Sequence, residues 1–299
     1  MRFPLNTILP HAGLALFVGL APLSVSQAQS NQAPTEPGIY AVKPVSPGAG
    51  PEGGKQKRVS GNCQPDPGGA KQVVRIIDTE TLRLGDGTLL KVSGLETADP
   101  IGMPGNTLIY YLKKLTLGKA VRSKRIHKNP DRYGRQRAQL FMGDKGGLSW
   151  VQAEIVKRGL AMVAPDVGAS QCTRELLGLE HQARQNKQGL WGAGIFQIRS
   201  ASRSKELLKY AQTFQIIEGR IKRLSTSRGK IYINFGRNWK NDLTISLTKS
   251  AAQAMKLDPE KLGELKGKFI RARGWVEINK GPLIRVSNSH QLEMMDRPR

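Results

Sequence analysis

A proline- and glycine-rich stretch near the start of the chain most limits where this protein can fold. Residues 31–70 contain 7 prolines and 8 glycines and show no hydrophobic period. Such a composition favours a flexible tether over a packed core. We therefore predict a disordered linker over residues 29–70 and ordered structure from Lys71 onward.

The residues before this linker have the pattern of an export signal. A short basic start precedes an apolar run from Ala12 to Val25, and a small-x-small sequence ends at Ala28. The alternative, a membrane span, needs about 20 apolar residues, whereas this run is shorter and contains Pro22. The sequence predicts a signal peptide over residues 1–28 and a periplasmic or secreted protein without a transmembrane segment.

The chain has only two cysteines, Cys63 and Cys172. This number excludes a disulfide-dense scaffold and a four-cysteine zinc site. An oxidising compartment permits disulfides, and an even count in an exported chain favours pairing. We expect a disulfide between these two residues, with two free buried thiols as the alternative.

The hydrophobic pattern over residues 71–199 combines short strands with helices. Alternating runs flank the turn Gly85-Asp86-Gly87, which indicates a β-hairpin. Five strand runs and three helix runs can be assigned, the helices over residues 104–117, 150–158 and 173–188. This content is typical of a small α+β barrel.

A second, mostly β module is predicted over residues 213–293, after a polar connection at residues 200–212. Residues alternate cleanly from Ile231 to Phe235, as in a strand with one buried face. Basic strands with interleaved aromatic residues, among them Trp275, suit single-stranded nucleic acid. The alternative is that rings such as Phe235 and Trp275 belong to the core. We expect a second OB-like barrel with no catalytic constellation.

Basic residues outnumber acidic residues throughout the chain. There are 47 Lys and Arg against 23 Asp and Glu, a formal net charge of +24. Residues 71–199 carry +10 and residues 200–299 carry +12, so neither module alone holds the excess. The charge predicts attraction to a polyanion or an acidic membrane surface.

Four short sequences between residues 73 and 191 follow one another in a recognisable order. They are Asp78-Thr79-Glu80-Thr81, the stretch from Lys91 to Asp99, Asp131-Arg132-Tyr133-Gly134-Arg135, and the stretch from Ala183 to Trp191. In this order and spacing the chain resembles the staphylococcal nuclease (thermonuclease) family over residues 71–195. The resemblance implies an OB-type five-stranded barrel with three helices that hydrolyses DNA and RNA phosphodiesters with Ca²⁺.

The resemblance also assigns roles to individual acidic residues. Glu80 and Glu96 would hold the cation, with the carbonyl of Thr97 as a further ligand. Asp99 would be the carboxylate near the attacking water. Oxygen ligands suit a hard divalent cation, Ca²⁺ first and Mg²⁺ or Mn²⁺ as alternatives, and a carboxylate can orient or deprotonate water. Taken without the resemblance, the same acids are typical of solvated turns.

Three further residues would contact the phosphate. Lys91 and Arg135 would be the two cations on the scissile group, and Tyr133 would contact the ligand phosphate. Fixed cations stabilise the charge that develops on phosphoryl oxygens during displacement. The alternatives are strand-face charges for the two cations and turn packing for the tyrosine.

Side-chain lengths depart from the family pattern, although every charge sign is retained. The family has Asp where this chain has Glu80 and Glu96, Glu where it has Asp99, and Arg where it has Lys91. A misplacement of roughly 1 Å can cost about 10²-fold in rate, and Lys lacks the fork with which Arg binds phosphate. We expect a weak nuclease, with an inactive module that binds nucleic acid or another acidic envelope polymer as the alternative.

Overall fold

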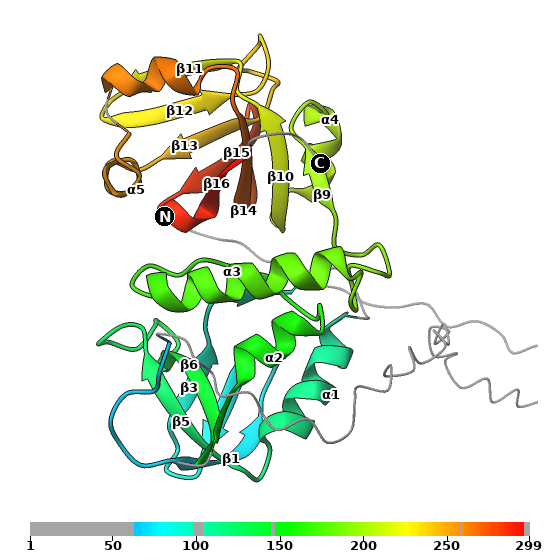
Figure 1. Cartoon of the computed structure of the whole chain (residues 1–299), viewed down its shortest axis with the longest axis vertical. Helices are drawn as coiled ribbons and strands as arrows, with labels where there is room; N and C mark the ends of the chain where they lie inside the picture. The colour runs from blue at the N-terminus through cyan, green and yellow to red at the C-terminus, as the bar shows by residue number, and fades with distance from the viewer. Residues whose placement is uncertain (1–62, 98–103, 145–146, 258, 296–299) are drawn as a thin grey trace, which may run out of the picture. The chain divides into compact units, whose positions relative to one another are not determined.

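The computed structural model describes residues 63–97, 104–144, 147–257 and 259–295. The predicted signal peptide and most of the predicted linker lie outside these residues. The described residues belong to one compact unit. We refer to residues 63–197 as the barrel part and to residues 198–295 as the C-terminal part (Figure 1).

Five short strands of the barrel part close into a mixed barrel. They are β1 (Lys71–Ile76), β2 (Thr81–Leu84), β3 (Leu89–Val92), β5 (Ala120–Arg125) and β6 (Arg135–Asp144). Antiparallel pairs join them in the order β3-β2-β1-β5-β6, and the parallel pair β3–β6 closes the ring. A sixth strand, β7 (Gly147–Trp150), extends the sheet beyond β6. The expected α+β fold with a five-stranded barrel is confirmed.

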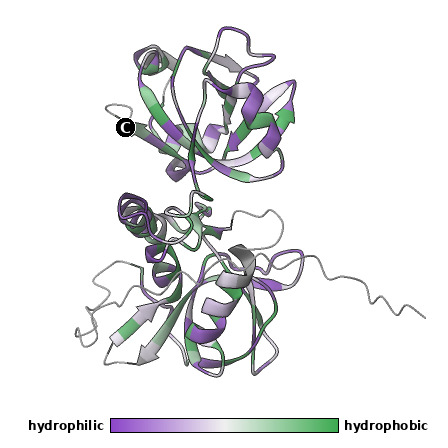
Figure 2. Ribbon diagram, turned by 90° about the vertical axis from the view of Figure 1, so that its right-hand side faces the viewer, coloured by the Kyte–Doolittle hydropathy of each residue, from purple (hydrophilic) through white to green (hydrophobic). Residues whose placement is uncertain are grey.

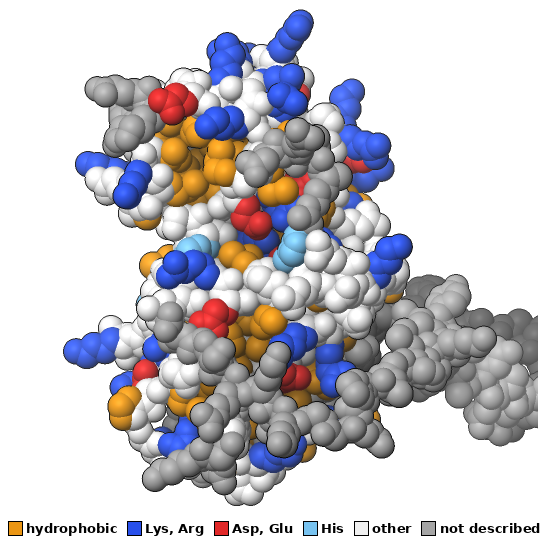
Figure 3. Space-filling model, in the orientation of Figure 1, with side chains coloured by type: hydrophobic (Ala, Val, Ile, Leu, Met, Phe, Trp, Pro, Cys, Tyr) orange, Lys and Arg blue, Asp and Glu red, His pale blue; other side chains and the backbone are white. Residues whose placement is uncertain are grey.

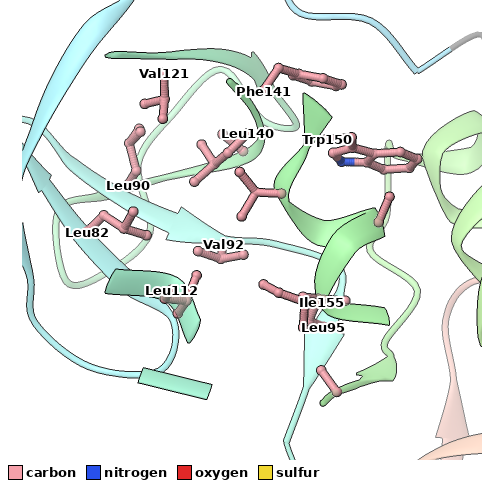
Figure 4. Close-up of a cluster of buried hydrophobic side chains, with 14 of the residues drawn as sticks. Leu82, Leu90, Val92, Leu95, Leu112, Val121, Leu140, Phe141, Trp150 and Ile155 are labelled. Carbon is pink, nitrogen blue, oxygen red and sulfur yellow. The ribbon is translucent and has the colours of Figure 1, made fainter. Parts of the chain in front are cut away.

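Helices α1 (Pro104–Thr116) and α2 (Val151–Lys157) cover the hydrophobic core of this barrel. Leu112 of α1 and Ile155 of α2 are fully buried together with Leu82, Leu90 and Leu140 of the strands (Figure 4). A contiguous apolar cluster of this kind supplies most of the driving force for folding. It also fixes the ends of β2, β3 and β6 relative to one another.

The third helix, α3 (Ser170–Gln185), begins and ends three residues earlier than predicted. At its amino end, the backbone N–H of Thr173, where the predicted helix begins, donates to the Ala169 carbonyl inside the first turn. Its carboxyl end is earlier because Lys187 has a φ of 49°, which a right-handed helix does not accommodate. The helix is also joined to Cys63 through a disulfide with Cys172.

The C-terminal part is built on a sheet of eight strands in the order β11-β12-β13-β15-β14-β10-β9, with β16 also paired to β14. Both hydrophobic and hydrophilic residues occur on the strands of this part (Figure 2). The strands are β9 (Ile198–Ser200), β10 (Phe214–Arg220), β11 (Arg223–Ser227), β12 (Lys230–Asn234), β13 (Thr244–Leu247), β14 (Phe269–Asn279), β15 (Gly281–Val286) and β16 (Leu292–Met295). The helical segments are α4 (Ser204–Leu207), η1 (Leu208–Tyr210), α5 (Lys249–Ala254), η2 (Pro259–Leu265) and η3 (Ser289–Gln291).

This second sheet is not closed into a barrel, so the expected second OB-like barrel is wrong in this respect. One edge of β10 pairs with β14, and its other edge pairs in parallel with β9. The backbone groups that a closing strand would use are therefore already bonded to β9. That strand is only three residues long and lies at the border of the segment that the sequence indicated as a connection.

Two arginines of β14 are buried rather than available to a polyanion. Arg271 is 3% exposed and donates from Nε to Glu218, and Arg273 is 1% exposed and packs against α3. The aromatic residues divide between core and surface, because Phe235 is buried whereas half of the Trp275 side chain is exposed. The expectation of a basic strand face thus fails for both arginines.

Lys and Arg side chains are common on the face of the molecule shown in Figure 3. Figure 3 shows more Lys and Arg than Asp and Glu side chains on the face in view. None of the helices in the described residues has the length and hydropathy needed to cross a membrane.

Candidate functional site

Glu80 lies between two cations at the meeting point of β2, β3 and β6. Its Oε2 atom is 2.9 Å from Lys91 Nζ and 3.7 Å from Arg135 Nη1. Thr81 is opposite Lys91 in the β2–β3 register, and the backbone N–H of Val92 donates to the Glu80 carbonyl over 2.7 Å. The strand pairing therefore brings three of the predicted site residues together.

Arg135 is held in one orientation by a short turn. Its Nε donates to Asp131 Oδ2 over 2.9 Å, and its Nη1 donates to Thr81 Oγ1 over 3.0 Å. The other carboxylate oxygen accepts from the backbone N–H groups of Arg135 and Tyr133. Gly134 allows this turn with a φ of 74°. Nη2 of Arg135 remains without a hydrogen-bond partner among the described residues.

Asp131 is a positioning residue that the sequence analysis did not single out. Burial alone would raise the pKa of its carboxyl group, but the backbone and side-chain hydrogen bonds from Arg135 outweigh that effect and lower the pKa. The carboxylate is therefore a charged partner at neutral pH. The available signal was an acid four residues before an arginine, across a Gly-containing turn.

Tyr133 stands on the surface beside the same turn. Its side chain is 61% exposed, and the guanidinium carbons of Arg132 and Arg135 lie 4.8 and 5.1 Å from its ring centroid. Its hydroxyl oxygen also accepts from Arg132 Nη2 over 2.7 Å. The ring therefore packs on the turn, which is the alternative given for Tyr133 in the sequence analysis. It also remains accessible next to Arg135.

Glu96 is placed by a two-residue strand, β4 (Leu95–Glu96), which pairs with β8 (Met162–Val163). The preceding turn needs Gly94, whose φ is +86° and whose added Cβ would lie 3.1 Å from Gln139 Nε2. That amide donates to the Ser93 carbonyl over 2.9 Å. Buried hydrogen bonds thus fix the chain just before Glu96.

The carboxyl group of Glu96 is electrostatically coupled to Glu80. Burial and, to a smaller extent, the Glu80 carboxylate raise the pKa of Glu96 to about 7, although Lys91 opposes the shift. The half-buried Thr97 follows directly in the chain, and Asp99 lies outside the described residues. The structure therefore brings Glu80, Glu96 and Lys91 into one electrostatic group.

Comparison with known families identifies part of the chain. Residues 105–193 match the family model described as Staphylococcal nuclease homologue. These residues form an SNase family domain. The SNase domain includes Tyr133 and Arg135, whereas Glu80, Lys91 and Glu96 precede it. The match over these residues indicates a possible nuclease. The search of curated proteins gave no match.

Two carboxylates beside the SNase domain have the donor chemistry of a Ca²⁺ site, the cation that the family typically uses. Ca²⁺ takes oxygen ligands, and a cation between Glu80 and Glu96 would offset the burial and the smaller repulsion from Glu80 that raise the pKa of Glu96. No cluster of three or more His, Cys, Asp or Glu forms within the parts of the chain that the structure describes. The residues present thus fit as part of a ligand set, to which the Thr97 carbonyl was also predicted to belong.

Proposed function

We propose that this chain is an exported phosphodiesterase of thermonuclease type that hydrolyses nucleic acid with a divalent cation, Ca²⁺ first. The observation that carries the proposal is the position of Glu80, which is ion-paired with Lys91 and Arg135 and electrostatically coupled to Glu96. Phosphodiester displacement needs carboxylates and cations in this proximity.

Lys91 and Arg135 are the groups that would bind the scissile phosphate. Arg135 is anchored through Nε and Nη1, which leaves Nη2 to donate to a phosphoryl oxygen. Because this guanidinium is already fixed before the substrate binds, it loses little further conformational entropy when it stabilises the charge that develops on that oxygen. The accessible ring of Tyr133 would contact the neighbouring phosphate from the same turn.

Glu80, Glu96 and the carbonyl of Thr97 would hold the cation. A bound divalent cation polarises a phosphoryl oxygen and lowers the pKa of a coordinated water. Asp99, two residues after Thr97, would orient or deprotonate the attacking water. We expect low turnover because Glu80, Glu96, Asp99 and Lys91 all differ in length from the family pattern.

A second candidate function is binding without cleavage. Glu80 is ion-paired to both Lys91 and Arg135, and these pairs compete with a cation and with a phosphate for the same groups. A site locked in this arrangement would bind nucleic acid, or another acidic envelope polymer, through the surrounding positive charge alone.

A cleavage assay distinguishes the two functions. Purified protein is incubated with DNA or RNA in Ca²⁺, Mg²⁺, Mn²⁺ or a chelator, beside the Arg135→Ala and Glu80→Ala variants. The matched control is Arg83→Ala, which removes an exposed arginine of β2. We expect cleavage that chelator stops, that Arg135→Ala reduces about 10²- to 10³-fold, and that Arg83→Ala leaves unchanged.

Other results would decide against hydrolysis. Tight, salt-sensitive binding without cleavage in any cation would support the second function. Full activity of Glu80→Ala would remove the proposed role of that carboxylate.

Export is part of the proposal and has its own test. The pairing of Cys63 with Cys172 supports it, since such bonds persist in oxidising compartments. Cell fractionation and amino-terminal sequencing of the recovered protein should give a periplasmic or secreted chain that begins at Gln29. A cytoplasmic chain that retains its first residues would contradict export.

A further inference from the structure

A groove continues from the candidate site onto the C-terminal part. It has a volume of about 320 Å³ and is lined by Lys91 and Glu96 from the barrel part and by Trp275 and Arg285 from β14 and β15. A molecule whose phosphate lies against Lys91 would therefore extend into contact with the C-terminal sheet.

The outer face of β14 changes from buried to open along this groove. Arg271 and Arg273 on that face are almost fully buried. Trp275, the next residue on the same face, is 49% exposed and lines the groove. Its partner across the β10–β14 pair, Phe214, is buried. The sheet thus presents a large aromatic ring to solvent where the groove begins.

We propose that Trp275 stacks on an unpaired base of the nucleic acid, and that this groove holds a single-stranded segment next to the candidate site. The proposal rests on the proposed function and adds a substrate class to it. Aromatic side chains bind single strands because every base offers a π-face, whereas Lys and Arg follow the backbone.

Two ion pairs belong to the lining of the groove that also includes Trp275. Arg137 pairs with Asp166 on the barrel side, and Arg285 Nε lies 2.8 Å from Glu277 Oε2 on the sheet side. Each carboxylate neutralises its arginine, so the lining is not a strongly positive channel. Recognition here depends more on stacking than on charge, which distinguishes this groove from the surrounding basic surface.

Stacking on Trp275 selects against duplex nucleic acid. Bases inside a duplex are stacked on both faces by their neighbours, so an indole reaches a base face only where the strand is unpaired. Base–aromatic stacking changes affinity by about 5- to 100-fold when the ring is removed.

The test measures binding in chelator, where cleavage does not interfere. A fluorescently labelled oligothymidylate and a labelled duplex are titrated with the purified protein, Trp275→Ala, Trp275→Phe and Trp239→Ala. Trp239 is the matched control because it is 50% exposed on the same part and lies over Lys280 rather than in the groove. We expect Trp275→Ala to weaken single-strand binding about 5- to 100-fold and Trp275→Phe to recover most of it.

Duplex binding should change little in any of these variants, and Trp239→Ala should match the unmodified protein. Equal single-strand affinity of Trp275→Ala and the unmodified protein would overturn the proposal, as would no single-strand binding by the unmodified protein at low salt. An equal loss in Trp239→Ala would also overturn it. Measuring binding in chelator separates this result from the proposed function. If binding depends on Trp275 but no cation supports cleavage, the proposed nuclease function is rejected and the role of Trp275 in binding stands.

Discussion

Arg273 of β14 donates from Nη1 to Glu180 Oε2 of α3 over 2.9 Å, and each side chain is 1% exposed. The same two residues hydrogen-bond to the backbone of Val163 in β8. Glu180 accepts from the Val163 N–H over 2.7 Å, and Arg273 donates to the Val163 carbonyl over 3.0 Å. Val163 is also paired with Leu95 of β4, so the C-terminal part is bonded to β8, the partner of the strand that carries Glu96.

Removing Arg273 should destabilise the protein strongly. Arg273→Ala leaves the buried Glu180 carboxylate with only the longer ion pair to Arg184, 3.7 Å away, and breaking a buried pair in this way costs about 3–5 kcal/mol. Urea unfolding measures the change in the free energy of unfolding. Arg285→Ala is the control, since the exposed Arg285–Glu277 pair should contribute only about 0–1 kcal/mol. A second variant, Arg273→Met with Glu180→Leu, removes both charges and should recover part of the loss. Equal stability of Arg273→Ala and Arg285→Ala would contradict the prediction.

The same network predicts a pH dependence through Glu293. Burial alone would raise the pKa of its carboxyl group, but the charge and hydrogen bond of Arg273, with Arg271 and Arg184, lower the pKa below its ordinary value. A carboxyl group with a lowered folded-state pKa contributes stability above its unfolded pKa of about 4.3 and loses it as the pH falls through the folded value. Glu293→Gln should therefore be less stable than the unmodified protein at pH 7, and the difference should shrink below about pH 4. Urea unfolding across this range measures it, and a difference that grows towards low pH would contradict the assignment.

Local patterns predicted the barrel well because its strands are close in sequence and its turns have strong signals. The Gly85-Asp86-Gly87 turn and the register that follows it place Lys91 opposite Thr81. The Arg273–Glu180 pair was not predictable in the same way. The two residues are 93 positions apart, and nothing local distinguishes an arginine that will be buried from one on a solvated strand.

The open second sheet was missed for a related reason. Strand β9 has three residues and no alternation of its own, and it forms only because β10 offers an unpaired edge. The position of Trp275 also depends on tertiary contacts, because the alternation of β14 gives its face but not what covers that face. For the candidate site, the sequence predicted which acidic and basic residues lie close together. The positioning role of Asp131 was recognised only from its hydrogen bonds to Arg135 in the structure.

The disulfide should add substantially to stability. Cys63 and Cys172 are 109 residues apart, and closing so long a loop restricts the unfolded chain, with a typical cost of about 2–5 kcal/mol when the bond is removed. We expect the Cys63→Ala/Cys172→Ala variant to unfold at lower urea concentration than the oxidised protein. As a control, the double variant is unfolded with and without reductant, and its two unfolding curves should coincide. If the unmodified protein is as stable in reductant as it is without reductant, the prediction is contradicted.

Asp131 should control the rate through the orientation of Arg135. Asp131→Asn retains an oxygen acceptor for the two backbone N–H groups but then places its amide NH2 group against Arg135 Nε, which needs an acceptor. The guanidinium then loses its charge-assisted bond, and a misplacement of roughly 1 Å lowers kcat/KM about 10²-fold. The control is Asp86→Asn, because Asp86 also accepts from a backbone N–H in a turn and pairs with a cation, Lys71, away from the site. Cleavage kinetics should show the loss of kcat/KM in Asp131→Asn and not in Asp86→Asn. The two variants should have the same melting temperature, so that the loss does not come from unfolding. Full activity of Asp131→Asn would show that Arg135 needs no fixed orientation.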